Sequence, residues 1–227
     1  MIRLESNGFT IVELMIATGI LSVILLICAT SLIDIGRTYN KGVISTQTQD
    51  ATRAIMQDAS NLVQFGSTIP KAGAPQSFNS LAEQSYCIGT TRYTFGKNAQ
   101  VNDGLSAGTY NAQHQSLHAL WRDTTTNPGL CPLVDLTASG DLSNAGNSGV
   151  PGSGQEMVPV NMRLKEFSIN LLPVSGSKVY DIHVTVIYGN DADTVLTGGV
   201  ATGCGNNIIG GSYCGISDLS TEVYRYL

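Results

Sequence analysis

The fold is decided near the start of the chain, where residues 6–33 read SNGFTIVELMIATGILSVILLICATSLI. Within this stretch, the twenty residues from Leu14 to Ile33 carry no charge. A helix of that length rises about 30 Å, which is the thickness of one bilayer core. The stretch therefore predicts a transmembrane helix. Glu13 lies at its edge, and a carboxylate drawn to mid-bilayer would cost up to about 2.5–3.5 kcal/mol.

Two other kinds of N-terminal signal fit this stretch less well. A cleaved secretory signal needs a basic start and a small-residue cleavage site, but Arg3 is offset by Glu5 and Ala29 has no small partner. A lipoprotein signal would end at Cys28, and the residue before it would be small, whereas here it is Ile27. A transmembrane helix that stays in the mature protein is therefore favoured.

The segment from Ser6 to Ile20 closely resembles the N-terminus of type IV pilins, and the residues that match are Gly8, Phe9, Thr10, Glu13 and Leu14. The resemblance implies that a prepilin peptidase removes residues 1–8 as a leader by cutting after Gly8. It implies that the new N-terminal residue, Phe9, is N-methylated. It also implies that Glu13, with Thr10 beside it, serves subunit assembly by pairing with the N-terminal amine of a neighbouring subunit.

The charges around the apolar stretch give the topology only weak support. The leader carries one Arg and one Glu, whereas pilin leaders are usually basic, and Arg37 and Lys41 lie beyond the span. The resemblance, rather than the count of charges, therefore implies a cytoplasmic N-terminus. It places the protein in the inner membrane with a periplasmic headpiece, and later in a filament on the cell surface.

The apolar stretch is expected to continue as one long helix from Phe9 to Gln64, because no proline occurs between Phe9 and Ile69. Its first half is apolar all round, with the transmembrane part at about 14–33. Its second half is amphipathic and should lie against a folded domain. The apolar residues there recur near helical spacing: Ile44, Ala51, Ile55, Ala59, Leu62 and Val63. Gly66 is the expected C-cap, and Gly19, Gly36 and Gly42 are candidate bends.

Residues 65–227 are expected to form a headpiece rich in β-strands. Alternating apolar and polar residues predict strands at 167–171 and 180–188, joined by a turn at 175–177, with Tyr180 and Val184 facing the helix. Weaker strand patterns lie at 116–122 and 222–227, and residues 69–79 and 140–159 are expected to be loops. A long helix followed by an antiparallel sheet is an α+β fold, and it is similar to the pilin fold.

The cysteines predict disulfides and hence an oxidising compartment. Cys28 lies in the apolar stretch, and the other four lie at wide spacings in polar sequence, which leaves three possible pairings. We expect Cys87–Cys131 and Cys204–Cys214. Glycines between the second pair allow that short segment to turn back, and type IV pilins often close their C-terminal loop in a similar position. Cys28 should stay free.

The overall charge argues against nucleic-acid binding. Charged residues make up 13% of the chain, the net charge is −5 and the isoelectric point is about 5.0. Beyond residue 64 only eight Lys and Arg residues are scattered over the chain, so no basic stripe is available to neutralise phosphates. We therefore expect no nucleic-acid partner.

Several residues that could carry chemistry are interpreted as structural. His114 and His118 could share one helical face toward a metal, but no third ligand is evident, so both are expected at the surface. His183 is expected on the solvated side of its strand and Trp121 in the core. Residues 190–193 offer oxygens that calcium could use but lack an EF-hand pattern, so a turn is expected. We predict no catalytic residue, metal site or cofactor.

These features predict a structural subunit and not an enzyme. The favoured interpretation is a minor pilin of a type IV pilus that takes part in filament assembly or tip formation, with adhesion through headpiece loops. Its layout is similar to PilW-type minor pilins and J-type pseudopilins. Its partners would be other pilins, the inner membrane, the prepilin peptidase/methyltransferase and the pilus assembly platform. The alternatives are a type II secretion pseudopilin, a DNA-uptake pilus component and a membrane-anchored enzyme.

Overall fold

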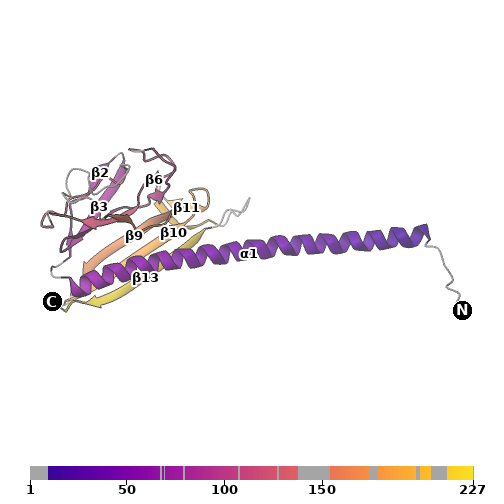
Figure 1. The fold of residues 1–227 in the computed structure, drawn as a ribbon, viewed down its shortest axis with the longest axis horizontal. Coiled ribbons are helices and arrows are strands. Elements are labelled where there is room, and N and C mark those ends of the chain that lie inside the picture. Colours follow the sequence, from indigo (N-terminus) through magenta and orange to yellow (C-terminus); the bar gives the residue numbers. More distant parts are fainter. Residues whose placement is uncertain are drawn as a thin grey trace. The chain divides into compact units, whose positions relative to one another are not determined.

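The computed structural model describes residues 10–66, 68, 70–78, 80–106, 108–126, 128–137, 154–173, 178–197, 200–205 and 214–226. Contacts divide the chain into two units, Met1–Gly42 and Val43–Leu227, and the helix α1 (Ile11–Phe65) belongs to both (Figure 1). All the described strands lie in the second unit, which we call the headpiece unit. They are β1 (Lys71–Ala72), β2 (Gln76–Phe78), β3 (Leu81–Ile88), β4 (Thr91–Gly96), β5 (Gln100–Val101), β6 (Gln115–Ser116), β7 (Leu120–Thr124), β8 (Gln155–Glu156), β9 (Met162–Leu171), β10 (Val179–Tyr188), β11 (Thr194–Thr197), β12 (Val200–Cys204) and β13 (Gly215–Tyr224).

The two ends of α1 follow from local chemistry. The helix begins after Thr10, whose hydroxyl accepts a hydrogen bond from the backbone N–H of Glu13 at 3.2 Å. It ends at Phe65, and a Cβ atom at Gly66 would approach the carbonyl oxygen of Leu62 to 2.3 Å. Only glycine fits this C-terminal position. The single helix predicted between residues 9 and 64 is confirmed, and it is not interrupted at the glycines expected to bend it.

The amphipathic second half of α1 is also confirmed. Its buried residues recur three or four positions apart, which places them along one face. They are Thr48, Ala51, Thr52, Ile55, Met56, Ala59 and Val63. Within the headpiece unit, this face belongs to the same hydrophobic cluster as Tyr180 and Val184 of β10. Tyr180 and Val184 therefore face the core to which the helix also contributes.

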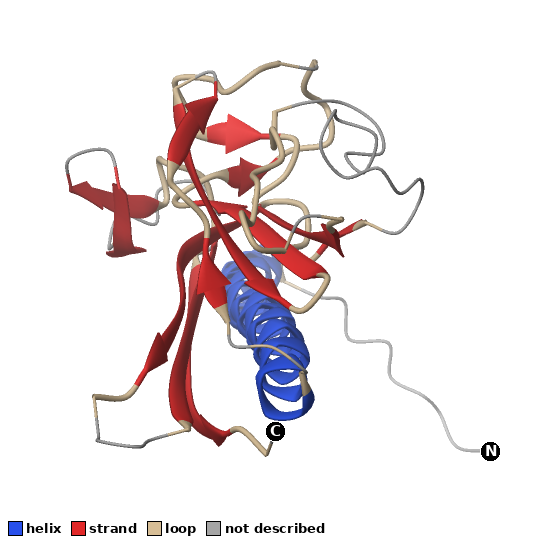
Figure 2. Ribbon diagram, turned by 90° about the vertical axis from the view of Figure 1, so that its left-hand side faces the viewer, coloured by secondary structure: helices blue, strands red, loops and turns tan. Residues whose placement is uncertain are grey.

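The headpiece unit contains two main sheets (Figure 2). The first sheet has the strand order β1-β3-β4-β7-β8, with β2 also paired to β3, and the second has the order β13-β10-β9-β5-β6. The hairpin β11-β12 forms a small separate sheet. The central pair β9 and β10 is antiparallel, with Ile182 opposite Ile169 and Val184 opposite Phe167. These are the two strands that alternation predicted, while the turn expected at 175–177 lies outside the described residues.

Phe167 joins the two main sheets in the core. Its ring centre lies 5.8 Å from that of Tyr86, 5.4 Å from that of Tyr93 and 5.3 Å from that of Phe95, and these three rings come from β3 and β4. Such tilted and edge-to-face ring pairs add about 0.5–1.5 kcal/mol each beyond their buried area. The long apolar helix and the antiparallel sheets together confirm the expected α+β class and match a pilin fold.

Four expectations about strands and loops need correction. The strand predicted at 116–122 is two strands in different sheets, since β6 ends at Ser116 and β7 begins at Leu120. The strand predicted at 222–227 is the end of a longer strand, β13, which begins at Gly215. The loop predicted at 69–79 contains β1 and β2, which pair with β3. The loop predicted at 140–159 contains β8, although residues 138–153 lie outside the described residues.

Candidate functional site

Two of the N-terminal residues that resemble a prepilin signal, Thr10 and Glu13, lie together at the start of α1. Gly8 and Phe9 lie outside the described residues, but Thr10 and Glu13 are placed. One carboxylate oxygen of Glu13 accepts hydrogen bonds from the backbone N–H of Thr10 at 3.0 Å and from its hydroxyl at 2.9 Å. Together with the bond from Glu13 N–H to the Thr10 hydroxyl, this is a reciprocal capping box. The carboxylate is thereby held at the positive end of the helix dipole.

The surface that follows Glu13 is apolar on every side. Its large hydrophobic side chains are exposed by half or more of their area, from 51% at Ile24 to 70% at Leu32. Among the described residues, α1 is the one helix long and apolar enough to cross a membrane.

The few polar side chains in this stretch are satisfied by the helix itself. The hydroxyl of Thr18 donates to the Met15 carbonyl at 3.0 Å, and that of Ser22 donates to the Thr18 carbonyl at 2.7 Å. Such local bonds remove the cost of placing a hydroxyl in an apolar medium. The N-terminal half of α1 is therefore suited to lipid or to the stems of other subunits.

The structure joins Cys87 to Cys131 and Cys204 to Cys214, with Cα–Cα distances of 5.6 and 5.4 Å. These are the two pairs expected from the sequence. Cys28 is free and exposed on α1. The first disulfide fastens residues 128–137, which we call the covering segment, to strand β3 of the first sheet.

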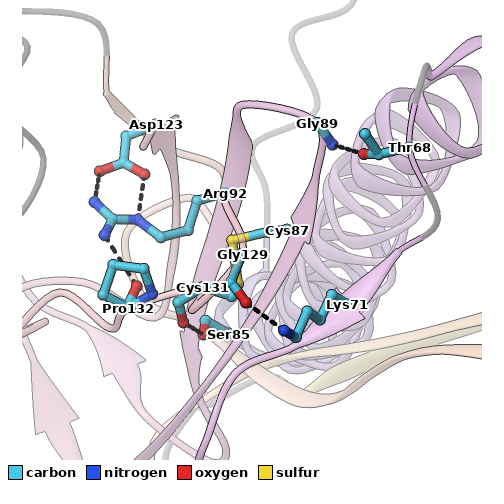
Figure 3. The surroundings of a disulfide bond; sticks show 10 residues. All are labelled: Thr68, Lys71, Ser85, Cys87, Gly89, Arg92, Asp123, Gly129, Cys131 and Pro132. Carbon is cyan, nitrogen blue, oxygen red and sulfur yellow. Dashed lines mark hydrogen bonds and ion pairs between the residues drawn. A yellow bond between two sulfur atoms is a disulfide. The ribbon is translucent and has the colours of Figure 1, made fainter. Parts of the chain in front are cut away.

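Buried polar side chains of the first sheet hold the covering segment in place (Figure 3). The hydroxyl of Ser85 donates to the carbonyl of Cys131 at 2.8 Å, and the guanidinium of Arg92 donates to the carbonyl of Pro132 at 2.9 Å. Arg92 also forms a bidentate ion pair with Asp123, and both side chains are completely buried. Sequence reasoning missed this cluster because no spacing rule predicts which charged residues of neighbouring strands become buried.

A second carboxylate under the covering segment is Glu83, which is fully buried on β3. One of its oxygens accepts a hydrogen bond from the backbone N–H of Leu136 at 3.0 Å, and the other has no hydrogen-bond partner among the described residues. Burial raises the pKa of Glu83 to about 8, the Leu136 N–H opposes that shift, and the charge of Asp135 adds to it. The folded chain therefore holds a proton on this carboxyl at neutral pH.

The acidic residues at 190–193 do form a turn, as expected, and one of them is already bound by side chains of the headpiece. Asp191 forms an ion pair with the buried Arg163 at 2.8 Å and accepts a contact from Nδ1 of His114 at 2.8 Å. Arg163 also donates to the carbonyl of Gly189 at 3.2 Å. Asp191 therefore fastens this turn to the second sheet. Within the described part of the chain, no group of three or more His, Cys, Asp or Glu side chains could hold a metal ion.

The histidines differ from the expectation of exposed surface residues. His114 does not lie on a helix: its φ is +57°, and the side chain of Asn111 accepts hydrogen bonds from the backbone N–H groups of Gln113 and Gln115 around it. Such Asx turns stabilise a left-handed residue. His118 is largely buried beside Glu156, at 3.3 Å, so the two histidines do not share a face toward a metal.

His183 and Trp121 lie close to where the sequence places them. His183 is on the outer side of β10, between Glu166 at 3.6 Å and Asp218, and it is partly exposed. The Trp121 ring is in the core, as expected, with 6% of its area exposed.

Comparison with protein families finds one match, to the prokaryotic N-terminal methylation motif, at residues 4–29. This span contains the residues at the start of α1 and most of the apolar stretch. Comparisons with curated proteins and with solved structures found no match to this chain. The match and the fold support a type IV pilin-like or pseudopilin protein, which is a structural subunit processed by a prepilin peptidase and anchored in a membrane before assembly.

Proposed function

We propose that the chain is a minor pilin of a type IV pilus, processed between Gly8 and Phe9, methylated on Phe9 and built into the filament through its N-terminal helix. The observation that carries this proposal is the match to the methylation motif at residues 4–29, which extends into the exposed apolar part of α1. Residues 1–8 are the leader, residues 9–64 the stem and residues 65–227 the headpiece, which faces the periplasm before assembly.

The capping box supports a role for Glu13 in assembly. Its carboxylate is exposed and is oriented by Thr10 toward the helix N-terminus. A positively charged N-terminal amine from a neighbouring subunit would find this carboxylate already in place. Two charges that meet between apolar stems are far better accommodated than one left alone, so the pair fixes the register of the subunits even where it adds little net stability.

The variant Glu13→Ala tests this role. We expect membrane insertion to be unchanged or slightly better, because a costly charge is removed. Incorporation into filaments should fall, because the neighbour's amine loses its partner. The measurement compares the amount of variant in membranes and in filaments sheared from the cell surface. Asp34→Ala, which removes an exposed carboxylate further along the same helix, is the matched control. Equal incorporation of both variants would contradict the proposed pairing.

A type II secretion pseudopilin is the alternative, because the same N-terminal residues serve both kinds of filament. Deletion of the gene distinguishes the two. Loss of surface filaments with normal export of secreted enzymes supports the pilus, while retention of those enzymes in the periplasm supports the pseudopilus. A role in adhesion would come from the headpiece loops. A role in DNA uptake would predict DNA binding that weakens with salt.

A further inference from the structure

The free edges of the two main sheets differ in length. The edge strands of the first sheet, β1, β2 and β8, have two or three residues, and the edge strand β6 of the second sheet has two. The other edge of the second sheet is β13, with ten residues (Figure 1). Proteins commonly shorten their edge strands so that the unpaired backbone groups do not recruit other chains. Among the described strands that end the two main sheets, β13 is the longest.

Apart from two acidic side chains, strand β13 also lacks the bulges, prolines and lysines that protect other edges. It pairs with β10 over ten consecutive residues, from Gly215 opposite Tyr188 to Tyr224 opposite Val179, without a bulge. It contains neither proline nor lysine. Alternate residues of an antiparallel strand direct their N–H and C=O groups away from the paired neighbour. The segment from Asp218 to Tyr224 therefore presents a regular row of backbone donors and acceptors to another strand.

The side chains along this edge define what would pair with it. Asp218 and Glu222 are exposed on the outer face, four residues apart. Asp218 contacts His183 of β10. Glu222 lies directly opposite Asp181 of β10, and the described contacts give neither Glu222 nor Asp181 a basic partner. Like charges opposite each other destabilise a sheet. On the inner face, Leu219 is partly buried and Val223 is buried.

We propose that β13 is a docking edge for an extended strand of another polypeptide, which carries two basic residues four positions apart and apolar residues between them. The added strand would continue the second sheet by backbone hydrogen bonds. Its basic side chains would lie opposite Asp218 and Glu222 and relieve the repulsion between Glu222 and Asp181. Its apolar side chains would extend the inner face beside Leu219 and Val223.

A second copy of β13 is a poorer partner for the same edge. Antiparallel registers centred on Asp218, Ser220 or Glu222 each place a carboxylate opposite a carboxylate of the other copy. The charges therefore favour a basic strand from a different chain over self-pairing.

The test uses a synthetic peptide with the sequence Thr-Val-Lys-Val-Thr-Val-Lys-Val-Thr, whose lysines fall opposite Glu222 and Asp218 in the antiparallel register. Its binding to the full chain in detergent is measured by fluorescence anisotropy. We expect saturable binding, and protection of alternate β13 amides from hydrogen exchange. The same peptide with glutamate in place of both lysines should bind more weakly by about fivefold or more, since two favourable cross-strand pairs become repulsive.

Two kinds of variant separate edge pairing from other modes of binding. Glu222→Lys should weaken binding of the lysine peptide and strengthen binding of the glutamate peptide. Of Ser220→Pro and Thr221→Pro, one removes an N–H bonded to β10 and should destabilise the sheet, while the other removes an N–H at the free edge and should fold without binding the peptide. No binding, equal binding of both peptides, or undiminished binding by the folded proline variant would overturn the proposal. Concentration-dependent protection of β13 without peptide would overturn it in favour of self-pairing.

Discussion

The N-terminal half of α1 and the headpiece unit place their apolar and polar side chains in opposite ways. In the N-terminal half, apolar side chains are exposed and polar ones are satisfied by the helix that carries them. In the headpiece unit, apolar side chains are buried together, and charged side chains such as Arg92 and Arg163 are buried with partners from distant parts of the chain. The headpiece unit completes its own interior, whereas the N-terminal half leaves its apolar surface for lipid or other subunits.

This difference decides where a substitution affects the stability of the isolated chain. A change in the headpiece unit removes contacts that the chain makes with itself, and a similar change in the N-terminal half removes almost none. The single tryptophan, Trp121, lies in the headpiece core, so its fluorescence reports unfolding of that unit in the full chain.

The largest contrast is expected between two ion pairs. Asp123→Ala leaves the guanidinium of Arg92 buried without its partner and should lower the free energy of unfolding by about 3–5 kcal/mol. Asp34→Ala breaks an exposed ion pair with Arg37, in which the closest atoms of the two side chains are 3.9 Å apart. This substitution should change the free energy of unfolding by less than about 1 kcal/mol. Denaturant unfolding of the full chain in detergent measures both. Similar effects of the two variants would contradict the difference between the regions.

A matched pair of leucines sharpens the comparison. Leu164 is fully buried on β9, so Leu164→Ala should cost about 2–5 kcal/mol through the cavity that it leaves. Leu21 in the N-terminal half is 55% exposed, so Leu21→Ala should leave headpiece unfolding within about 0.5 kcal/mol of the unchanged chain. The same unfolding measurement compares them. A large effect of Leu21→Ala would show that this half of the helix supports the headpiece.

The pH dependence of headpiece stability should depend on Glu83. The folded chain holds the Glu83 proton up to its raised pKa of about 8, while the unfolded chain releases it near 4.5. The folded state therefore binds the extra proton between these values, and its stability should fall as pH rises from 4.5 to 8. The expected loss between pH 5 and pH 8 is on the order of 3 kcal/mol.

Glu83→Gln is the matched variant for this dependence. The amide keeps an acceptor for the Leu136 N–H but cannot ionise, so most of the loss with rising pH should disappear. Unfolding measured at pH 5, 6.5 and 8 compares the two chains. A variant that loses stability as steeply as the unchanged chain would assign the pH dependence to other groups.

The sequence predicted those parts of the fold in which the local pattern of apolar and polar residues matches the burial of the side chains. The long helix follows from the absence of proline and a helical stripe of apolar residues, and β9 and β10 follow from strict alternation. Strands β3 and β4 were missed because one face of each is polar and yet buried. Glu83, Ser85 and Arg92 lie on that face beneath the covering segment. No local pattern reveals that a distant segment covers such a face.

The candidate site at the N-terminus was recognisable because its chemistry is contiguous in sequence. Thr10 and Glu13 also have the spacing of a capping box, a second signal that the resemblance to pilins does not use. The structure shows that this capping box forms. The open edge of β13 was not recognisable, because Ser217 and Thr221 interrupt the apolar face of the strand. Its freedom on one side depends on the order of strands in the sheet, which the sequence does not state.

The mass of the mature protein tests the central claim most directly. If the N-terminal segment is a prepilin signal, the chain purified from membranes should begin at Phe9 and number 219 residues, that is 227 − 8, with one added methyl group on its N-terminal amine. Intact-mass measurement with sequencing of the N-terminal peptide gives this result in one experiment. A chain that begins at Met1, or one cleaved near Ala29, would contradict the account.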